Sequence, residues 1–158
     1  EAVTSGEQVV DMFAGVGPYA IPMATHGASV VACDLNEQAI EYLRENAVNN
    51  GVAEKVTAVA GDARLLPNEY GGTADRIVMN LPHTADAFLD TAVALAGDDC
   101  VIHYYDIQHE DDPFGPGTQA IESATAEQYT VSIETTRIVR SYAPHEYNVC
   151  IDARLTQN

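Results

Sequence analysis

Acidic residues and glycines follow three short β-branched runs, at positions where an open α/β sheet would bind a ligand. Asp11 comes four residues before Gly15, in a glycine-rich segment that also contains Gly17. Asp34 ends the second run, and Asp62 follows the third. Ligands of such sheets bind at the carboxyl ends of the strands, and glycines let the backbone approach a ligand closely. The pattern predicts a nucleotide-like ligand, with Asp34 accepting ribose hydroxyls and Asp62 accepting an adenine amino group.

Asp11 distinguishes between two classes of ligand. The spacing from Gly15 to Ala20 also fits the dinucleotide fingerprint G-x-G-x-x-G/A. A carboxylate just before the glycines would repel a pyrophosphate, but it suits the ammonium and sulfonium charges of S-adenosylmethionine. We therefore expect S-adenosylmethionine as the cofactor. A nicotinamide-dependent oxidoreductase is the weaker alternative, because no residue set for hydride transfer stands out.

Asn80 and Pro82, at the end of a fourth run, are candidates for positioning a substrate. Asn80 offers an amide, and Pro82 stiffens a turn that directs backbone carbonyls into the pocket. Such a site can orient a planar nitrogen base against a methyl donor. In amino methyltransferases the next position usually holds an aromatic residue that stacks on the base. Here it is His83, to which we assign no role.

These candidates need a sheet whose strands end at one edge. The chain alternates β-branched runs with amphipathic stretches, which is typical of parallel strands with helices on both faces. We predict strands at 8–13, 29–34, 55–60, 75–80 and 100–107, helices at 18–25, 36–49, 84–95 and 118–127, and a final antiparallel pair of strands at 129–139 and 147–155. This order predicts a single α/β domain over residues 1–158. Its sheet is seven-stranded, mostly parallel and doubly wound, as in Rossmann-like class I S-adenosylmethionine-dependent methyltransferases.

The charge of the chain is strongly unbalanced, with 24 Asp and Glu against 7 Lys and Arg and a net charge of -17. An acidic surface aids solubility, but a single lysine, Lys55, fits adaptation to molar salt better. We therefore expect a halophilic source. The imbalance argues against a nonspecific nucleic-acid clamp at ordinary salt, although RNA could still be bound through shape and base contacts.

The cysteines, the histidines and the hydropathy bear on the cellular compartment, on metal binding and on membrane insertion. The three cysteines lack C-x-x-C spacing, which indicates a reducing, cytoplasmic compartment. The five histidines are scattered, so we predict no metal site. No apolar run approaches the roughly 20 residues of a membrane helix. The chain does not begin with Met, and we expect it to be a fragment of a longer protein.

Several segments together resemble the archaeal and eukaryotic tRNA (guanosine-37, N1) methyltransferases. The segment DMFAGVGPY at 11–19 is similar to the opening of that family. The other similar segments are IP at 21–22, ACDLN at 32–36, EN at 45–46, GDAR at 61–64, DRIVMNLP at 75–82, FL at 88–89, VIHYY at 101–105 and the stretch 139–147. The related wybutosine aminocarboxypropyl transferases share the first loop but lack Asn-Leu-Pro after the fourth strand, so Asn80-Leu81-Pro82 favours methyl transfer.

The resemblance implies a knotless seven-stranded domain that binds S-adenosylmethionine and methylates N1 of guanosine 37, next to the tRNA anticodon. It implies that Asn80 and Pro82 hold the guanine and that Glu7 is the general base, since the proton on N1 must leave as the methyl arrives. The cofactor-binding residues are then Asp11, Phe13, Ala14, Gly15, Gly17, Asp34, Leu35, Asp62, Ala63 and Asn80.

The chain also departs from the family. Members carry an N-terminal tRNA-binding part, and an arginine thought to matter in catalysis, that are absent from this chain. We therefore expect tRNA to be bound mainly through those parts. Two alternatives remain: a methyltransferase of another RNA base, and a noncatalytic module that binds cofactor or docks a partner. The sequence predicts no oligomeric state.

Overall fold

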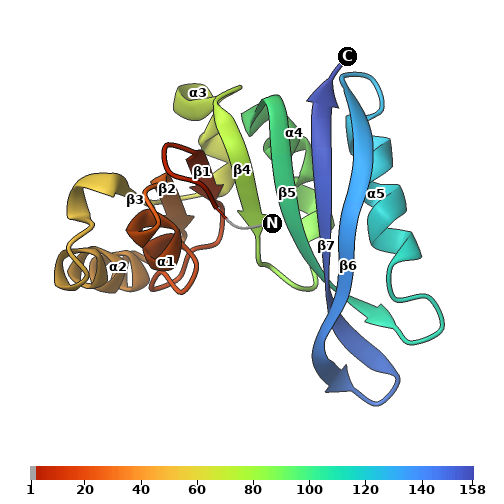
Figure 1. Cartoon of the computed structure of the whole chain (residues 1–158). Helices are drawn as coiled ribbons and strands as arrows, with labels where there is room; N and C mark the ends of the chain where they lie inside the picture. The colour runs from red at the N-terminus through yellow and green to blue at the C-terminus, as the bar shows by residue number, and fades with distance from the viewer. Residues whose placement is uncertain (1–2) are drawn as a thin grey trace.

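The computed structural model describes residues 3–158 and contains one seven-stranded sheet in the order β3-β2-β1-β4-β5-β7-β6 (Figure 1). The strands are β1 Gln8–Asp11, β2 Ser29–Asp34, β3 Val56–Ala60, β4 Ala74–Met79, β5 Ala96–His109, β6 Tyr129–Ala143 and β7 Glu146–Gln157. The helices are α1 Ala20–Thr25, α2 Glu37–Asn49, α3 Pro67–Tyr70, α4 Leu89–Leu95 and α5 Gly115–Thr125. Three short 3-10 turns lie at Ala53–Lys55, Ala63–Leu65 and Ala85–Phe88.

The direction of the strands matches the predicted fold. β1 pairs in parallel with β2 and β4, and the parallel pairing continues to β3 on one side and β5 on the other. β7 is antiparallel to both β5 and β6. The predicted antiparallel pair is therefore present, with β6 at the edge of the sheet and β7 between β5 and β6.

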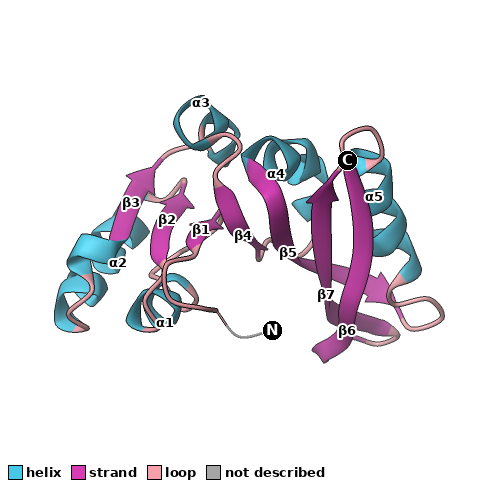
Figure 2. Cartoon of the chain, turned by 45° about the horizontal axis from the view of Figure 1, so that its top comes forward, coloured by secondary structure: helices cyan, strands magenta, loops and turns pink. Residues whose placement is uncertain are grey.

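The helices form two layers, one on each face of the sheet (Figure 2). α1 and α2 cover β1 to β3 on one face, whereas α4 and α5 cover β5, β7 and β6 on the other. Alternate strand residues face opposite layers, so Val9 packs with the first layer and Val10 with the second. Within residues 3–158, no helix covers the face of β5, β7 and β6 that lies on the α1 side.

The predicted boundaries hold best where a local signal fixes them. Asn36 caps α2 as expected, because its side-chain oxygen accepts hydrogen bonds from the backbone N–H groups of Gln38 and Ala39. The stretch predicted as a helix at 84–95 is instead a 3-10 turn followed by α4. The last three strands are longer than predicted, at 14, 15 and 12 residues, and α3 was missed.

Candidate cofactor site and active site

The carboxyl ends of β1, β2 and β3 form one pocket with the loop after β4. Five predicted cofactor residues line it, and so do two apolar residues from the segment after β4 that were not predicted to bind cofactor, Leu81 and Phe88. The full lining is Met12, Phe13, Asp34, Leu35, Gly61, Asp62, Ala63, Leu81 and Phe88. Most of these side chains are apolar, and the acidic ones are Asp34 and Asp62. This arrangement suits a planar ring between apolar surfaces with a polar ribose at the rim.

Aromatic and cation–π contacts hold the Phe88 ring in this pocket. The rings of Phe13 and Phe88 meet edge to face, with centroids 4.9 Å apart. The guanidinium of Arg64 lies 4.0 Å from the centroid of the Phe88 ring, and an ion pair of 3.2 Å joins Arg64 to Asp62. Phe88 is thus held between a ring and a cation. The only sequence signal for Phe88 was its place in a segment that resembles the tRNA methyltransferases.

The glycine loop after β1 is tied to the end of β2. Asp34 Oδ2 accepts a hydrogen bond of 2.8 Å from the Gly15 N–H, and its Oδ1 accepts one of 2.9 Å from the Asn36 N–H. Gly17 has a φ of +95°, and a Cβ there would clash with Leu43 Cδ1. Only glycine fits this backbone conformation and this close approach to α2. Asp34 therefore shapes the loop as well as facing the pocket.

Asp11 is the most unusual group at this edge. Its side chain is fully buried, and neither carboxylate oxygen has a hydrogen-bond partner among the described residues. Burial raises the pKa of Asp11 to about 7, and the nearby Asp34 carboxylate adds to the rise. The backbone amide of Phe13 opposes this rise without forming a full hydrogen bond. A buried carboxylate without a partner is costly, and a cationic ligand would supply the missing charge.

The loop after β4 places Asn80 and Pro82 next to this pocket, since Leu81 between them lines it. Asn80 and Pro82 are both half-buried. His83 has a φ of 117°, which is strained for a residue with a side chain. Its Nε2 lies 2.9 Å from the hydroxyl of Tyr142 on β6, and the two rings meet edge to face. The end of the loop is therefore fastened to the edge strand.

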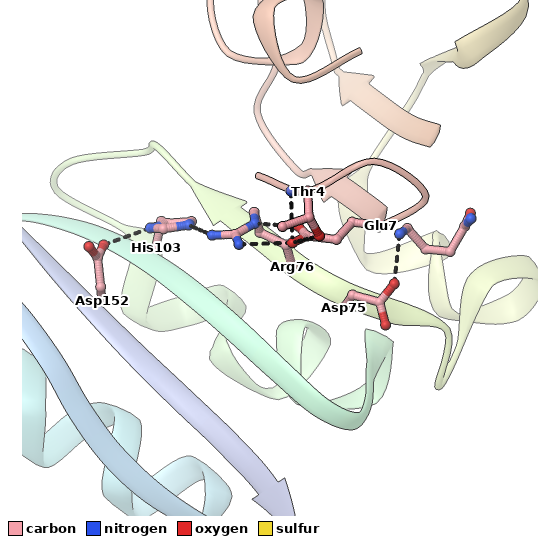
Figure 3. Close-up of polar contacts among 7 residues, drawn as sticks. Thr4, Glu7, Asp75, Arg76, His103 and Asp152 are labelled. Atoms are coloured by element: carbon pink, nitrogen blue, oxygen red, sulfur yellow. Dashed lines mark hydrogen bonds and ion pairs between the residues drawn. The ribbon is translucent and has the colours of Figure 1, made fainter. Parts of the chain in front are cut away.

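Glu7 does not line this pocket, and its role as the general base stays a prediction. It precedes β1, whereas Asp11 ends it, so the two are about 13 Å apart along the strand at about 3.3 Å per residue. Glu7 Oε2 forms an ion pair of 2.7 Å with Arg76, and Oε1 accepts hydrogen bonds from Thr4 (Figure 3). Partial burial would raise the pKa of Glu7, but these bonds lower it overall.

Glu7 is also the end of a chain of polar contacts across the sheet (Figure 3). Arg76 Nη1 donates to His103 Nε2 at 2.7 Å, and His103 Nδ1 lies 2.6 Å from Asp152 Oδ1. Since Arg76 can only donate, His103 Nε2 accepts and Nδ1 carries the proton toward Asp152. Asp152 Oδ2 accepts a further bond of 2.9 Å from Arg137. We call these five residues the polar chain; the sequence did not predict it.

Two charged members of the polar chain lie inside the protein. Arg76 and Asp152 are only 3% and 2% exposed. Burial alone would raise the pKa of Asp152, but the contacts with His103 and Arg137 lower it well below its usual range. Asp152 is therefore ionised and fully paired inside the protein.

Two further searches concern the described residues only. Within residues 3–158 no group of three or more His, Cys, Asp or Glu side chains is arranged to hold a metal ion. None of the helices in that range is long and apolar enough to span a membrane.

Comparison with known proteins identifies the family. A family model described as the TRM5/TYW2 methyltransferase domain matches residues 1–134. The chain belongs to this family. The tRNA (guanine(37)-N(1))-methyltransferase Trm5b of Pyrococcus abyssi is 44% identical over 153 residues, which cover 96% of this chain and 44% of that protein. Its crystal structure matches with a TM-score of 0.89 at 42% identity, covering 97% of this chain and 45% of that one.

The other branch of the TRM5/TYW2 family is also similar to this chain. The crystal structure of M. jannaschii TYW2 in complex with AdoMet matches with a TM-score of 0.92 at 30% identity, covering 98% of this chain and 71% of that one. The tRNA(Phe) (4-demethylwyosine(37)-C(7)) aminocarboxypropyltransferase of Pyrococcus horikoshii is 32% identical over 94% of this chain and 54% of its own length. The chain spans about half the length, or less, of these curated relatives.

Proposed function

We propose that this TRM5/TYW2 domain is the catalytic part of a larger S-adenosylmethionine-dependent enzyme that methylates N1 of guanosine 37 in tRNA. The observation that carries the proposal is Asp11, a buried carboxylate without a partner beside a glycine loop. A ligand with an ammonium and a sulfonium group completes such a site, whereas a pyrophosphate does not. The names of the similar Trm5b proteins support guanosine 37 as the target.

In this proposal different pocket residues bind different parts of the cofactor. Asp34 accepts the ribose hydroxyls, and Asp62 with the Ala63 N–H meets the adenine edge. Phe13, Leu35, Leu81 and Phe88 enclose the ring. Asp11 neutralises the cationic end, beside the backbone of Ala14, Gly15 and Gly17. Leu35 is 73% exposed, so a bound ring would cover an otherwise solvated leucine.

In this proposal Asn80 and Pro82 bind the substrate. The cofactor supplies an electrophilic methyl group on a sulfonium. The Asn80 amide and the carbonyls of the turn at Pro82 would hold guanine so that N1 faces that methyl. The N1 proton must leave, and in this proposal the Glu7 carboxylate accepts it.

The experiment compares two tRNA transcripts, one with guanosine 37 and one with adenosine at that position. With the intact protein and labelled cofactor, we expect N1-methylguanosine from the first and no product from the second. We expect Asn80→Ala to lower the rate at least tenfold, which is about 1.4 kcal/mol, with little change in cofactor affinity. The matched control is Asn49→Ala, at an exposed position on α2.

Other outcomes would contradict the proposal in distinct ways. Equal methylation of both transcripts would indicate another RNA base, and cofactor binding without turnover would indicate a noncatalytic module. The match to TYW2 makes aminocarboxypropyl transfer the second candidate, because the same cofactor carries both groups. The mass of the modified nucleoside separates the two, and an aminocarboxypropyl adduct would overturn methyl transfer.

We also propose that the protein is cytoplasmic and adapted to molar salt. Its three cysteines are free and buried, which suits a reducing compartment. Repulsion within a chain of net charge -17 is screened over about 3 Å at 1 M salt but about 10 Å at 0.1 M. We expect the melting temperature to fall sharply when KCl is lowered from molar to millimolar. A cooperative melt that does not move with salt would exclude this adaptation.

A further inference from the structure

The second half of β6 is an exposed strip at the edge of the sheet. Residues 134–142 are all exposed, and we call residues 135–142 the β6 strip. Three large side chains in it are half exposed, at 50% for Ile138, 46% for Val139 and 47% for Tyr142. Such a cluster of apolar and aromatic groups on an edge strand usually marks an interaction surface.

The charge of the β6 strip is opposite to that of the rest of the chain. Residues 135–144 include Arg137 and Arg140 but no Asp or Glu, although the chain has 24 acidic residues and only 7 basic ones. Arg137 pairs with Asp152, whereas Arg140 makes no ion pair within residues 3–158. The acidic surface of the chain would repel a polyanion such as RNA, and the β6 strip would repel it least.

The register places both arginines on the helix-free face of the sheet. Arg137 pairs across from Cys150 and Arg140 from Asn148, and residues 148 and 150 of β7 point to the same face. Asn148 is 6% exposed, and its amide oxygen accepts no hydrogen bond from any described residue. A ribose hydroxyl or a base amino group beside Arg140 could supply the missing donor.

The β6 strip also reaches the candidate active site. β6 runs in the same direction as β4, so its carboxyl end lies at the same edge of the sheet as the cofactor pocket. In Figure 1 the β6–β7 hairpin extends past the ends of β1 to β4 at this edge. The contact of 2.9 Å between Tyr142 and His83 joins the strip directly to the Asn80-Leu81-Pro82 loop.

We propose that the β6 strip binds the RNA strand next to the target nucleotide. Arg140 contacts a phosphate, and Tyr142, beside His83, stacks on a neighbouring base. A cation that follows the backbone and an aromatic ring that stacks on bases are the usual elements of single-stranded RNA binding. The inference rests on the proposed function, and it assigns to this domain a share of RNA binding separate from the cofactor pocket.

The test uses the intact protein and an RNA hairpin with the sequence of the anticodon stem-loop, including guanosine 37. The double variant Arg140→Ala/Tyr142→Ala is expected to raise the dissociation constant of the hairpin about tenfold or more. The slope of log affinity against log salt should fall by about 0.7 to 0.9, because one phosphate contact is lost. Cofactor affinity should stay unchanged.

The matched control replaces the same two residue types elsewhere. Tyr42 is 51% exposed and Arg44 is exposed, both on α2. Tyr42→Ala/Arg44→Ala should leave hairpin affinity and salt slope as they are in the unaltered protein. The difference between the two double variants then measures the β6 strip and not a general loss of positive charge.

The outcomes separate this inference from the proposed function. If the unaltered protein methylates guanosine 37 and both double variants bind the hairpin equally well, the strip does not bind RNA and the function stands. If the β6 variant changes the oligomeric state with hairpin affinity unchanged, the strip is an interface between copies and the inference is wrong. If the unaltered protein neither binds nor methylates the RNA, the proposed function fails and the inference fails with it.

Discussion

Asp11→Asn is expected to weaken S-adenosylmethionine binding by about 10- to 100-fold and to make the cofactor-free protein more stable. The carboxylate of Asp11 is fully buried without a hydrogen-bond partner. An interaction with a charged partner contributes about 1.5–3 kcal/mol, which sets the size of the loss in affinity. Because the Asn amide is neutral, the variant buries no charge at this position. The same change therefore stabilises the cofactor-free protein.

The pH dependence gives this prediction a sign that can be checked. The folded-state pKa of Asp11 is raised from 3.8 to about 7. Between about pH 4 and pH 7 the folded protein keeps a proton that the unfolded chain has released. The contribution of Asp11 to stability therefore falls as pH rises through this window. Asp11→Asn should abolish this contribution, and in the unaltered protein cofactor affinity should rise as pH approaches 7 and Asp11 ionises.

Calorimetric titration and thermal melts between pH 5 and pH 8 test both parts. The control is Asp98→Asn at an exposed position, which should change neither affinity nor melting temperature appreciably. Unchanged cofactor affinity in Asp11→Asn would remove Asp11 from the binding site. A melting temperature lowered at every pH would show that Asp11 has a structural partner that the geometry does not reveal.

Arg76→Met is expected to lower the free energy of unfolding by about 3–5 kcal/mol, the usual effect of removing one member of a buried ion pair. Arg76 is 3% exposed and contacts both Glu7 and His103. Without it, the Glu7 carboxylate and His103 Nε2 lose their common donor inside the protein. Chemical denaturation measures the loss, with Arg44→Met, at an exposed position on α2, as the control. A loss below about 1 kcal/mol would show that the polar chain does not stabilise the fold.

Glu7→Gln separates the structural role of Glu7 from a catalytic one. Since Glu7 is held by Arg76 and Thr4, we expect Glu7→Gln to lower stability. Since we propose Glu7 as the general base, we also expect methyl transfer per folded molecule to fall at least about tenfold. Cofactor affinity should not change. A rate within about twofold of the unaltered protein in fully folded Glu7→Gln would exclude Glu7 as the general base.

The sequence by itself determined the fold class and five of the residues that line the candidate cofactor pocket. β-branched runs and the glycines that follow them are local signals, so the sequence shows where each strand ends. Because parallel strands present their carboxyl ends at one edge of the sheet, the residues that follow them are expected to form one site. Asp34 and Asp62 therefore lie in one pocket as predicted from their positions after neighbouring strands. The Asn36 cap at the start of α2 is local in the same way.

Only the tertiary structure decided the contacts of Glu7, the burial of Asp11 and the polar chain. Glu7 and Arg76 are 69 residues apart and His103 and Asp152 are 49 residues apart, so their contacts depend on strand order and register. A shift of register by one residue would move each side chain to the other face of the sheet. Spacing along the chain therefore shows which strand holds a residue, and the assembled sheet sets which partners surround it.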